Sequence, residues 1–179
     1  MIERDRAALI VIDFQDKLLT KIRHNDTILP KAVNLVRFAR SLELPVLWTE
    51  QYKKGLGPTN PELESELEGI PGIEKMSFGC LGEPQFAAAL AATGRKQLLI
   101  TGIEAHICVM QTALSARQAG YEVFVATDAV GSCNDSDREA GLARMERAGV
   151  ELVTTQMAMF EILREAGTPE FKKVLPLLK

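Results

Sequence analysis

Apolar residues occur along this chain in short continuous runs, separated by longer stretches in which they return every three or four positions. The clearest runs are residues 7–12, 44–49, 98–101 and 121–127. Continuous apolar runs of this length are typical of strands that a parallel sheet buries on both faces. In the stretches between the runs, the spacing of the apolar residues is that of helices with one buried face.

Helices are therefore predicted between the strands. They cover about residues 29–42, 62–68, 83–92, 108–119 and 135–148, with weaker strands at 73–80 and 151–155 and a final helical stretch broken near 167–169. Strict alternation of strands and helices implies right-handed crossovers and a sheet between two helix layers. We predict an α/β fold, a three-layer α/β/α arrangement around a parallel Rossmann-like sheet, as a single domain over residues 1–179.

Composition narrows the classes of function. The formal net charge is -3 without a long block of like charges, so we expect no nucleic-acid partner, which usually requires a basic face. No apolar run approaches the roughly 20 residues that cross a bilayer, and the charged start of the chain does not resemble a signal peptide. Three cysteines at unrelated spacings, Cys80, Cys108 and Cys133, favour reduced thiols and a cytoplasmic location.

Cys108 is the candidate nucleophile. It stands where the strand at 98–101 gives way to a helix. Unpaired N–H groups and the positive end of the helix dipole at such a junction favour a thiolate over a thiol. We therefore expect the pKa of Cys108 to lie below about 8.5, the ordinary value for a thiol.

Asp13 and Lys75 are its candidate partners. Asp13 ends the first strand, at the sheet edge where α/β proteins bind ligands, although an Asx turn or a helix N-cap explains it equally well. A lone lysine such as Lys75 is usually a solvated surface group. Together, an ammonium can stabilise the thiolate and a carboxylate can take the thiol proton and return it to a leaving group.

Other mechanisms find less support. The dinucleotide-binding and phosphate-loop glycine motifs are absent. The two histidines, His24 and His106, are too far apart in sequence for a His-rich metal site, although carboxylates alone can hold magnesium. We expect His106 to line or support the pocket of Cys108 rather than to act as a general base. No metal and no cofactor are predicted.

Three segments in series resemble the isochorismatase-like cysteine hydrolases. They read Val-Ile-Asp-Phe-Gln at 11–15, Lys-Met-Ser-Phe at 75–78 and Gly-Ile-Glu-Ala-His-Ile-Cys-Val-Met-Gln-Thr-Ala at 102–113. The likeness extends from end to end, and residues 49–59 are most similar to the isochorismatase domain-containing proteins of undefined substrate. It implies a six-stranded parallel sheet and a homo-oligomer.

The resemblance also implies a role for individual residues. Cys108 corresponds to the nucleophile, Asp13 to the base and Lys75 to the third member of a triad. A cis peptide bond is implied at Ile103–Glu104. The backbone N–H groups of Glu104 and Cys108 would then form the oxyanion hole.

The chain departs from the family pattern in two places. Nicotinamidases of the family carry an Asp-x-His and a second His for a metal after the second strand, where this chain reads Thr-Glu-Gln-Tyr at 49–52. No metal ligand carries over, which argues against nicotinamidase activity. The serine that often follows the Lys-x-x-Phe motif is Gly79 here, a change that removes no triad member.

The leading hypothesis is a metal-independent hydrolase of a small amide or related C–N bond, acting through a Cys108 thioester. The alternatives are vinyl-ether hydrolysis of the isochorismate type, with Asp13 as the acid, and a non-catalytic or thiol-redox scaffold. Few charges surround the expected pocket, which favours a small uncharged substrate. A neighbouring subunit and these residues are expected to form its walls: Phe14, Gln15, Trp48, Gln51, Tyr52, Phe78 and His106.

Overall fold

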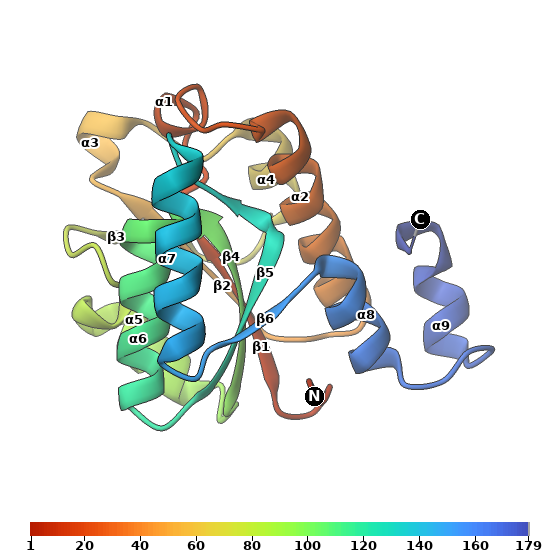
Figure 1. The fold of residues 1–179 in the computed structure, drawn as a ribbon. Coiled ribbons are helices and arrows are strands. Elements are labelled where there is room, and N and C mark those ends of the chain that lie inside the picture. Colours follow the sequence, from red (N-terminus) through yellow and green to blue (C-terminus); the bar gives the residue numbers. More distant parts are fainter. Residues whose placement is uncertain (179) are drawn as a thin grey trace.

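A sheet of six parallel strands forms the centre of the computed structural model, which describes residues 1–178 (Figure 1). The strand order is β3-β2-β1-β4-β5-β6. The strands are β1 (Ala7–Ile12), β2 (Val46–Gln51), β3 (Ile73–Lys75), β4 (Gln97–Ile103), β5 (Glu122–Gly131) and β6 (Glu151–Val153). Because all carboxyl ends of a parallel sheet lie at one edge, this order brings distant segments together there. The predicted α/β class is confirmed.

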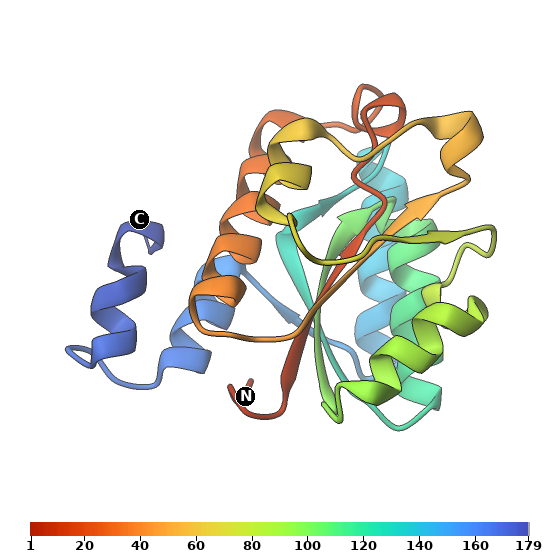
Figure 2. The same cartoon turned by 180° about the vertical axis from the view of Figure 1, so that it is seen from behind.

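Two layers of helices cover the faces of the sheet, as Figures 1 and 2 show from opposite sides. One layer contains α5 (Pro84–Ala92), α6 (Met110–Gln118) and α7 (Asp135–Arg147). The other contains α2 (Asn25–Ser41), α4 (Pro61–Glu66), α8 (Thr155–Leu163) and α9 (Pro169–Val174). Shorter elements are α1 (Asp16–Leu19), α3 (Lys53–Leu56), 3-10 turns at Cys80–Gly82 and Leu175–Leu177, and a π-helical turn at Ala105–Val109. No helix among residues 1–178 has the length and apolar character needed to cross a membrane.

The strands divide the core into two halves. All six residues of β1 are buried, and alternate ones belong to opposite clusters. Leu9 and Val11 pack toward α2, whereas Ile10 and Ile12 pack toward the layer of α5, α6 and α7. Burying one such side chain fully contributes about 1.5–3 kcal/mol. The continuous apolar run therefore reflects a strand that is covered on both faces.

Several elements differ in length from their predictions. Helix α2 begins at Asn25, four positions before the predicted start, and accommodates Pro30 within its first turns. Strand β5 continues to Gly131, beyond the predicted end at residue 127. The predicted loop after β2 contains the short helix α3. These ends depend on tertiary packing, which local sequence patterns do not report.

Gly102 brings the carboxyl ends of β1 and β4 into close contact. A Cβ at this position would lie 2.6 Å from the Cβ and 2.8 Å from the carbonyl oxygen of Ile12. Only glycine permits so close an approach. Asp13, the next residue after β1, is thereby placed beside the turn that follows β4.

Candidate active site

Asp13 and Lys75 meet at the carboxyl edge of the sheet, as the sequence predicted. Lys75 Nζ lies 2.7 Å from Asp13 Oδ2, and both side chains are fully buried. Cys108 belongs to the same site: the charges of Asp13 and Lys75 both act on the pKa of its thiol. Cys108 is itself 6% exposed. Three elements far apart in the sequence therefore bring a carboxylate, an ammonium and a thiol together.

The ammonium of Lys75 is fully engaged by acceptors. Its Nζ donates to Asp13 Oδ2 at 2.7 Å, to Gln51 Oε1 at 2.6 Å and to the Phe78 carbonyl at 3.0 Å, with the Ser77 carbonyl at 3.3 Å. Burial lowers the pKa of Lys75, but the Asp13 carboxylate and neighbouring thiols outweigh it and give a net rise. Since an ammonium has three protons, Lys75 stays charged and has none to spare for a substrate.

Both carboxylate oxygens of Asp13 accept hydrogen bonds. Thr49 Oγ1 donates to Oδ1 at 2.7 Å while Lys75 occupies Oδ2, and the Asp13 N–H donates to the Thr49 carbonyl at 3.1 Å. The residue has a left-handed backbone, with φ of 57°. Residues other than glycine seldom adopt this conformation, and such outliers gather at functional sites. The carboxylate is thus fixed in position before any substrate binds.

Cys108 lies within the π-helical turn Ala105–Val109 that precedes α6. Thr112 Oγ1 donates to the Cys108 carbonyl at 2.7 Å and accepts the Cys80 N–H at 2.9 Å. Burial and then the Asp13 carboxylate raise the pKa of the Cys108 thiol well above its usual value, against the opposing charge of Lys75. The prediction of a lowered pKa is therefore wrong, because desolvation outweighs the helix terminus.

The segment expected to bind an oxyanion precedes Cys108. The peptide bond between Ile103 and Glu104 is cis. The Glu104 N–H donates no hydrogen bond within residues 1–178, and the Glu104 carboxylate accepts the Cys133 N–H at 2.9 Å. The Glu104 N–H therefore has no hydrogen-bond acceptor among the residues that the structure describes.

Two of the expected pocket walls lie elsewhere. Phe14 and Trp48 are buried in the core cluster that packs against α2, on the opposite face of the sheet from Cys108. The Trp48 indole N–H donates to the Ile70 carbonyl at 2.9 Å. The alternation of side chains along β2 directs Trp48 to the other layer, and Phe14 belongs to the same core cluster.

The remaining expected walls have other contacts. Tyr52 lies against Gly55, where an added Cβ would collide with its ring. Gln15 binds backbone groups, donating to the Gln51 and Gly57 carbonyls and accepting the Gln51 N–H. Phe78 has an exposed ring and contributes its carbonyl to Lys75. His106 Nδ1 is 2.9 Å from Ser132 Oγ. The Gln51 side chain contacts Lys75 directly.

Thr49 and Thr112 contact Asp13 and Cys108, and neither was predicted from the sequence. Thr49 is a polar side chain at the carboxyl end of a buried strand, and Thr112 follows Cys108 by one helical turn. Once Asp13 and Cys108 are taken as candidates, these two positions in the sequence indicate further residues of the same site. Within residues 1–178, no three His, Cys, Asp or Glu side chains cluster closely enough to hold a metal ion.

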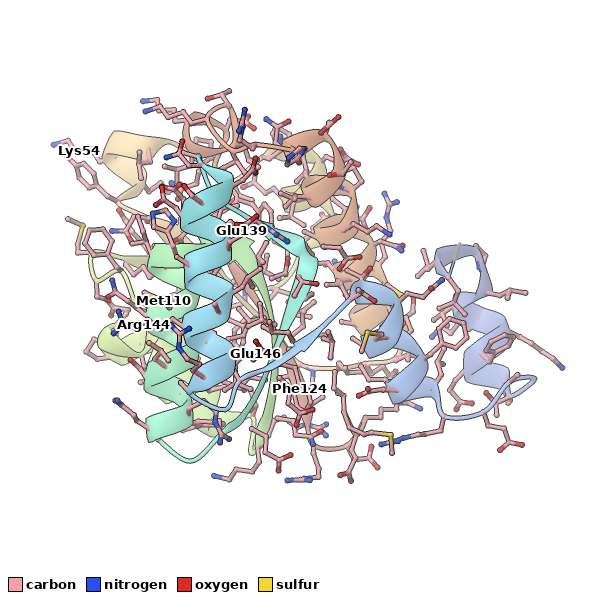
Figure 3. All side chains as sticks on the ribbon, in the orientation of Figure 1. Lys54, Met110, Phe124, Glu139, Arg144 and Glu146 are labelled. Carbon is pink, nitrogen blue, oxygen red and sulfur yellow. The ribbon has the colours of Figure 1, made fainter. Side chains whose placement is uncertain are left out.

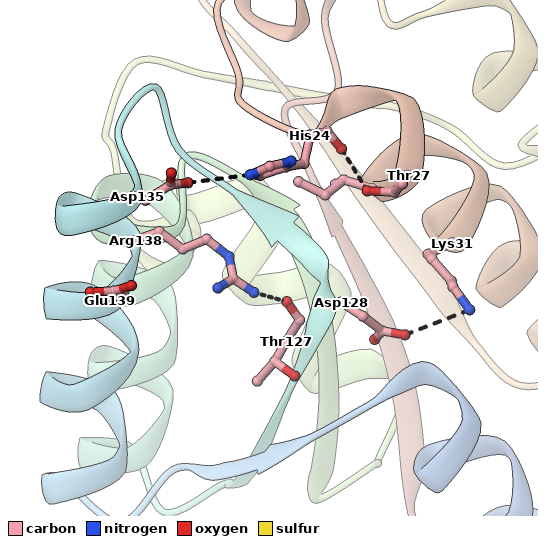
Figure 4. Close-up of a pocket in the computed structure, with 9 residues that line it drawn as sticks. His24, Thr27, Lys31, Thr127, Asp128, Asp135, Arg138 and Glu139 are labelled. Atoms are coloured by element: carbon pink, nitrogen blue, oxygen red, sulfur yellow. Dashed lines mark hydrogen bonds and ion pairs between the residues drawn. The ribbon is translucent and has the colours of Figure 1, made fainter.

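A separate hollow of about 420 Å³ lies between α2, β5 and α7 (Figure 4). Two pairs of its polar side chains lie close together: Lys31 Nζ is 3.8 Å from Asp128 Oδ2, and His24 Nε2 is 3.6 Å from Asp135 Oδ1. Arg138 donates to two backbone carbonyls of β5. The residues that line this hollow include no cysteine, and it is separate from the Asp13–Lys75 pair.

Comparison with known proteins gives consistent results. Residues 7–157 match the family model described as the isochorismatase domain. Isochorismatase domain-containing protein 2B of Mus musculus is 36% identical over 98% of this chain and 82% of its own length. MAR1 ribonuclease of Caenorhabditis elegans superimposes with a TM-score of 0.93 at 34% identity, covering 99% of this chain and 91% of that one.

A further solved structure is the YcaC gene product of Escherichia coli, described as an octameric hydrolase of unknown specificity. It superimposes with a TM-score of 0.93 at 31% identity, over 98% of this chain and 88% of that one. The matches extend over nearly the whole chain and agree with the parallel sheet found here. The chain therefore belongs to the isochorismatase family.

Proposed function

We propose that this protein is a metal-independent hydrolase that opens a small uncharged amide, or a related C–N bond, through a thioester on Cys108. The observation that supports this most directly is the buried Asp13–Lys75 pair, with Nζ and Oδ2 2.7 Å apart, next to the thiol. In this proposal Asp13 is the base and Lys75 is a fixed charge. No cofactor is required.

The reaction begins with transfer of the Cys108 proton to Asp13 as the sulfur forms a bond to the substrate carbonyl carbon. The carbonyl oxygen becomes an oxyanion, which the backbone N–H groups of Glu104 and Cys108 bind. Collapse of this intermediate breaks the C–N bond, and the amine leaves with the proton from Asp13. Water then gives a proton to Asp13 and attacks the thioester carbonyl, the C–S bond breaks to release the acid, and Asp13 returns the proton to the Cys108 sulfur.

The raised pKa of Cys108 suits this sequence of proton transfers. The thiol rests in its neutral form, because burial and the Asp13 carboxylate oppose its ionisation. Attack on substrate therefore depends on transfer of the proton to a nearby base, and Asp13 is the base in this proposal. Lys75 keeps the pair close to neutral overall, so that the carboxylate tolerates burial.

The test is turnover by Cys108→Ala, Cys108→Ser and Asp13→Asn in a screen of small amides. We expect loss of turnover in all three, and a covalent adduct on Cys108 in the wild type by mass spectrometry. Full turnover by folded Cys108→Ala would overturn the proposal. An RNA substrate in the same screen examines the activity named for the similar Caenorhabditis elegans protein.

Vinyl-ether hydrolysis of the isochorismate type is the second candidate. The raised pKa of Cys108 favours it, since hydrolysis of a vinyl ether requires protonation of a carbon atom rather than attack by a thiolate. Activity retained in Cys108→Ala and lost in Asp13→Asn on such a substrate would support it. A non-catalytic or thiol-redox scaffold is favoured only if every screened substrate fails with wild-type protein.

The setting of this activity is also part of the proposal. We propose a single domain over residues 1–179 and a cytoplasmic location. The octameric Escherichia coli homologue supports a homo-oligomer. Gel filtration with light scattering tests the last of these, and a monomer would contradict it.

A further inference from the structure

We propose that Gln51 is a positioning residue that holds the Lys75 ammonium against Asp13, so that its charge stays beside Cys108. This inference rests on the proposed function and gives a definite role to a residue first expected as a pocket wall. Gln51 is the last residue of β2 and is 8% exposed. Its side chain contacts the lysine directly.

The orientation of the Gln51 amide follows from its neighbours. Its Oε1 accepts from Lys75 Nζ at 2.6 Å, and its Nε2 donates to the Met76 carbonyl at 2.9 Å. The reversed amide would set an NH₂ group against an ammonium and an oxygen against a carbonyl. Gln51 is thus committed to Lys75, and it cannot turn toward a substrate without removing an acceptor from the buried charge.

The lysine has no equivalent replacement for this acceptor. Its three shortest contacts are to Asp13, Gln51 and the Phe78 carbonyl, which matches the three protons of an ammonium. Without Gln51, the third proton is left with the more distant Ser77 carbonyl at 3.3 Å. The ammonium then loses its side-chain anchor on β2.

The main chain of Gln51 is held as firmly as its side chain. Its N–H donates to Gln15 Oε1 at 2.8 Å, and its carbonyl accepts from Gln15 Nε2 at 3.0 Å. Thr49, two residues earlier on the same face of β2, donates to Asp13. One face of one strand therefore holds both members of the ion pair, Thr49 the carboxylate and Gln51 the ammonium.

A positioning role and a merely structural role predict opposite effects on Cys108. The titratable groups that act on this thiol include Asp13, Lys75 and Cys80, and the ammonium is the one that favours the thiolate. An unanchored ammonium gives a smaller thiolate fraction and slower alkylation. Loosened packing alone would expose the buried sulfur and make alkylation faster.

Iodoacetamide is the probe, because it needs no knowledge of the substrate. Wild-type protein, Gln51→Met and Gln51→Asn are alkylated from about pH 7 to 9.5, and modification of Cys108 is followed by peptide mapping. We expect Gln51→Met to slow alkylation about tenfold, as for one pKa unit. Gln51→Asn keeps the amide but is one methylene too short to hold Lys75 Nζ, and it is expected to slow alkylation as well.

Gln97→Met is the matched control. Gln97 is a buried glutamine with its own hydrogen bonds at the opposite, amino end of β4. The same substitution there should leave alkylation of Cys108 at the wild-type rate. It separates a general loss of stability from an effect on the ion pair.

Wild-type or faster alkylation of folded Gln51→Met overturns the inference. If that variant does not fold, Gln51→Asn decides in the same way, because its shorter side chain keeps the amide but not the reach to Lys75 Nζ: slower alkylation supports the inference, and an unchanged or faster rate overturns it. The proposed function is judged separately by turnover in Cys108→Ala. Loss of turnover there together with unchanged alkylation in Gln51→Met leaves the triad standing and removes only Gln51.

Discussion

Gly141 lies in the middle of α7, where an alanine would ordinarily make the helix more stable by about 1 kcal/mol. Here a Cβ would stand 2.8 Å from the Cα, 3.0 Å from the Cβ and 3.2 Å from the nitrogen of His106. Carbon atoms in contact prefer about 3.5 Å or more, so α7 or the π-helical turn must move by roughly 0.7 Å. Overpacking of this kind costs about 1–3 kcal/mol.

For Gly141→Ala, the two effects oppose each other and predict a net loss of about 0–2 kcal/mol in the free energy of unfolding. The effect on the site is expected to be larger, because the displaced turn carries Cys108 two residues further on. Misplacement of a reacting group by about 1 Å can cost on the order of 100-fold in rate. Turnover, once a substrate is found, should therefore fall far more than stability.

The assay combines urea unfolding with the kcat of the same variant. Ala140→Gly, on the exposed face of the same helix, is the control. It should lower stability by about 1 kcal/mol and leave kcat unchanged. A Gly141→Ala protein that is about 1 kcal/mol more stable than wild type, with unchanged kcat, would refute the reasoning. Figure 3 shows α7 with the side chains of Glu139, Arg144 and Glu146 along it and Met110 on neighbouring α6.

The other predictions concern groups around the thiol. Because burial and Asp13 raise the pKa of Cys108, its alkylation rate should still be rising at pH 9, and a plateau below pH 8 would contradict this. Thr112→Val removes the acceptor of the buried Cys80 N–H and should cost about 1–3 kcal/mol in urea unfolding, whereas Thr112→Ser should recover most of the loss. Lys75→Met leaves the Asp13 carboxylate buried without its ion pair and should lower the free energy of unfolding by about 3–5 kcal/mol in the same urea measurement. A loss of under about 1 kcal/mol would contradict this prediction.

The sequence alone predicted the alternation of the main strands and helices along the chain. It also predicted which residues at the strand ends are candidates for the site. Continuous apolar runs such as residues 7–12 indicate a doubly covered strand, and the residue that follows such a run lies at the ligand-binding edge. Asp13 could be selected on this ground without coordinates. Lys75 and Cys108 were predicted as its partners from the sequence motifs around them. The structure places Asp13 and Lys75 in contact.

The tertiary structure decided which face each side chain occupies. A run of consecutive apolar residues does not indicate which alternate positions face which helix layer. The sequence therefore predicted Trp48 at the site, whereas the structure places it in the opposite half of the core. Thr49 and Gln51 face the site because alternate residues of β2 point to opposite faces of the sheet, and these two lie on the face opposite to Trp48.

The direction of the pKa shift at Cys108 was likewise beyond the sequence. A thiol at the start of a helix suggests a lowered pKa, but its value depends on how much water reaches the sulfur. That exposure is set by segments from the whole chain that close around the carboxyl edge of the sheet. Local patterns fix secondary structure because it depends on near neighbours, whereas desolvation and side-chain pairing depend on residues that meet only after folding.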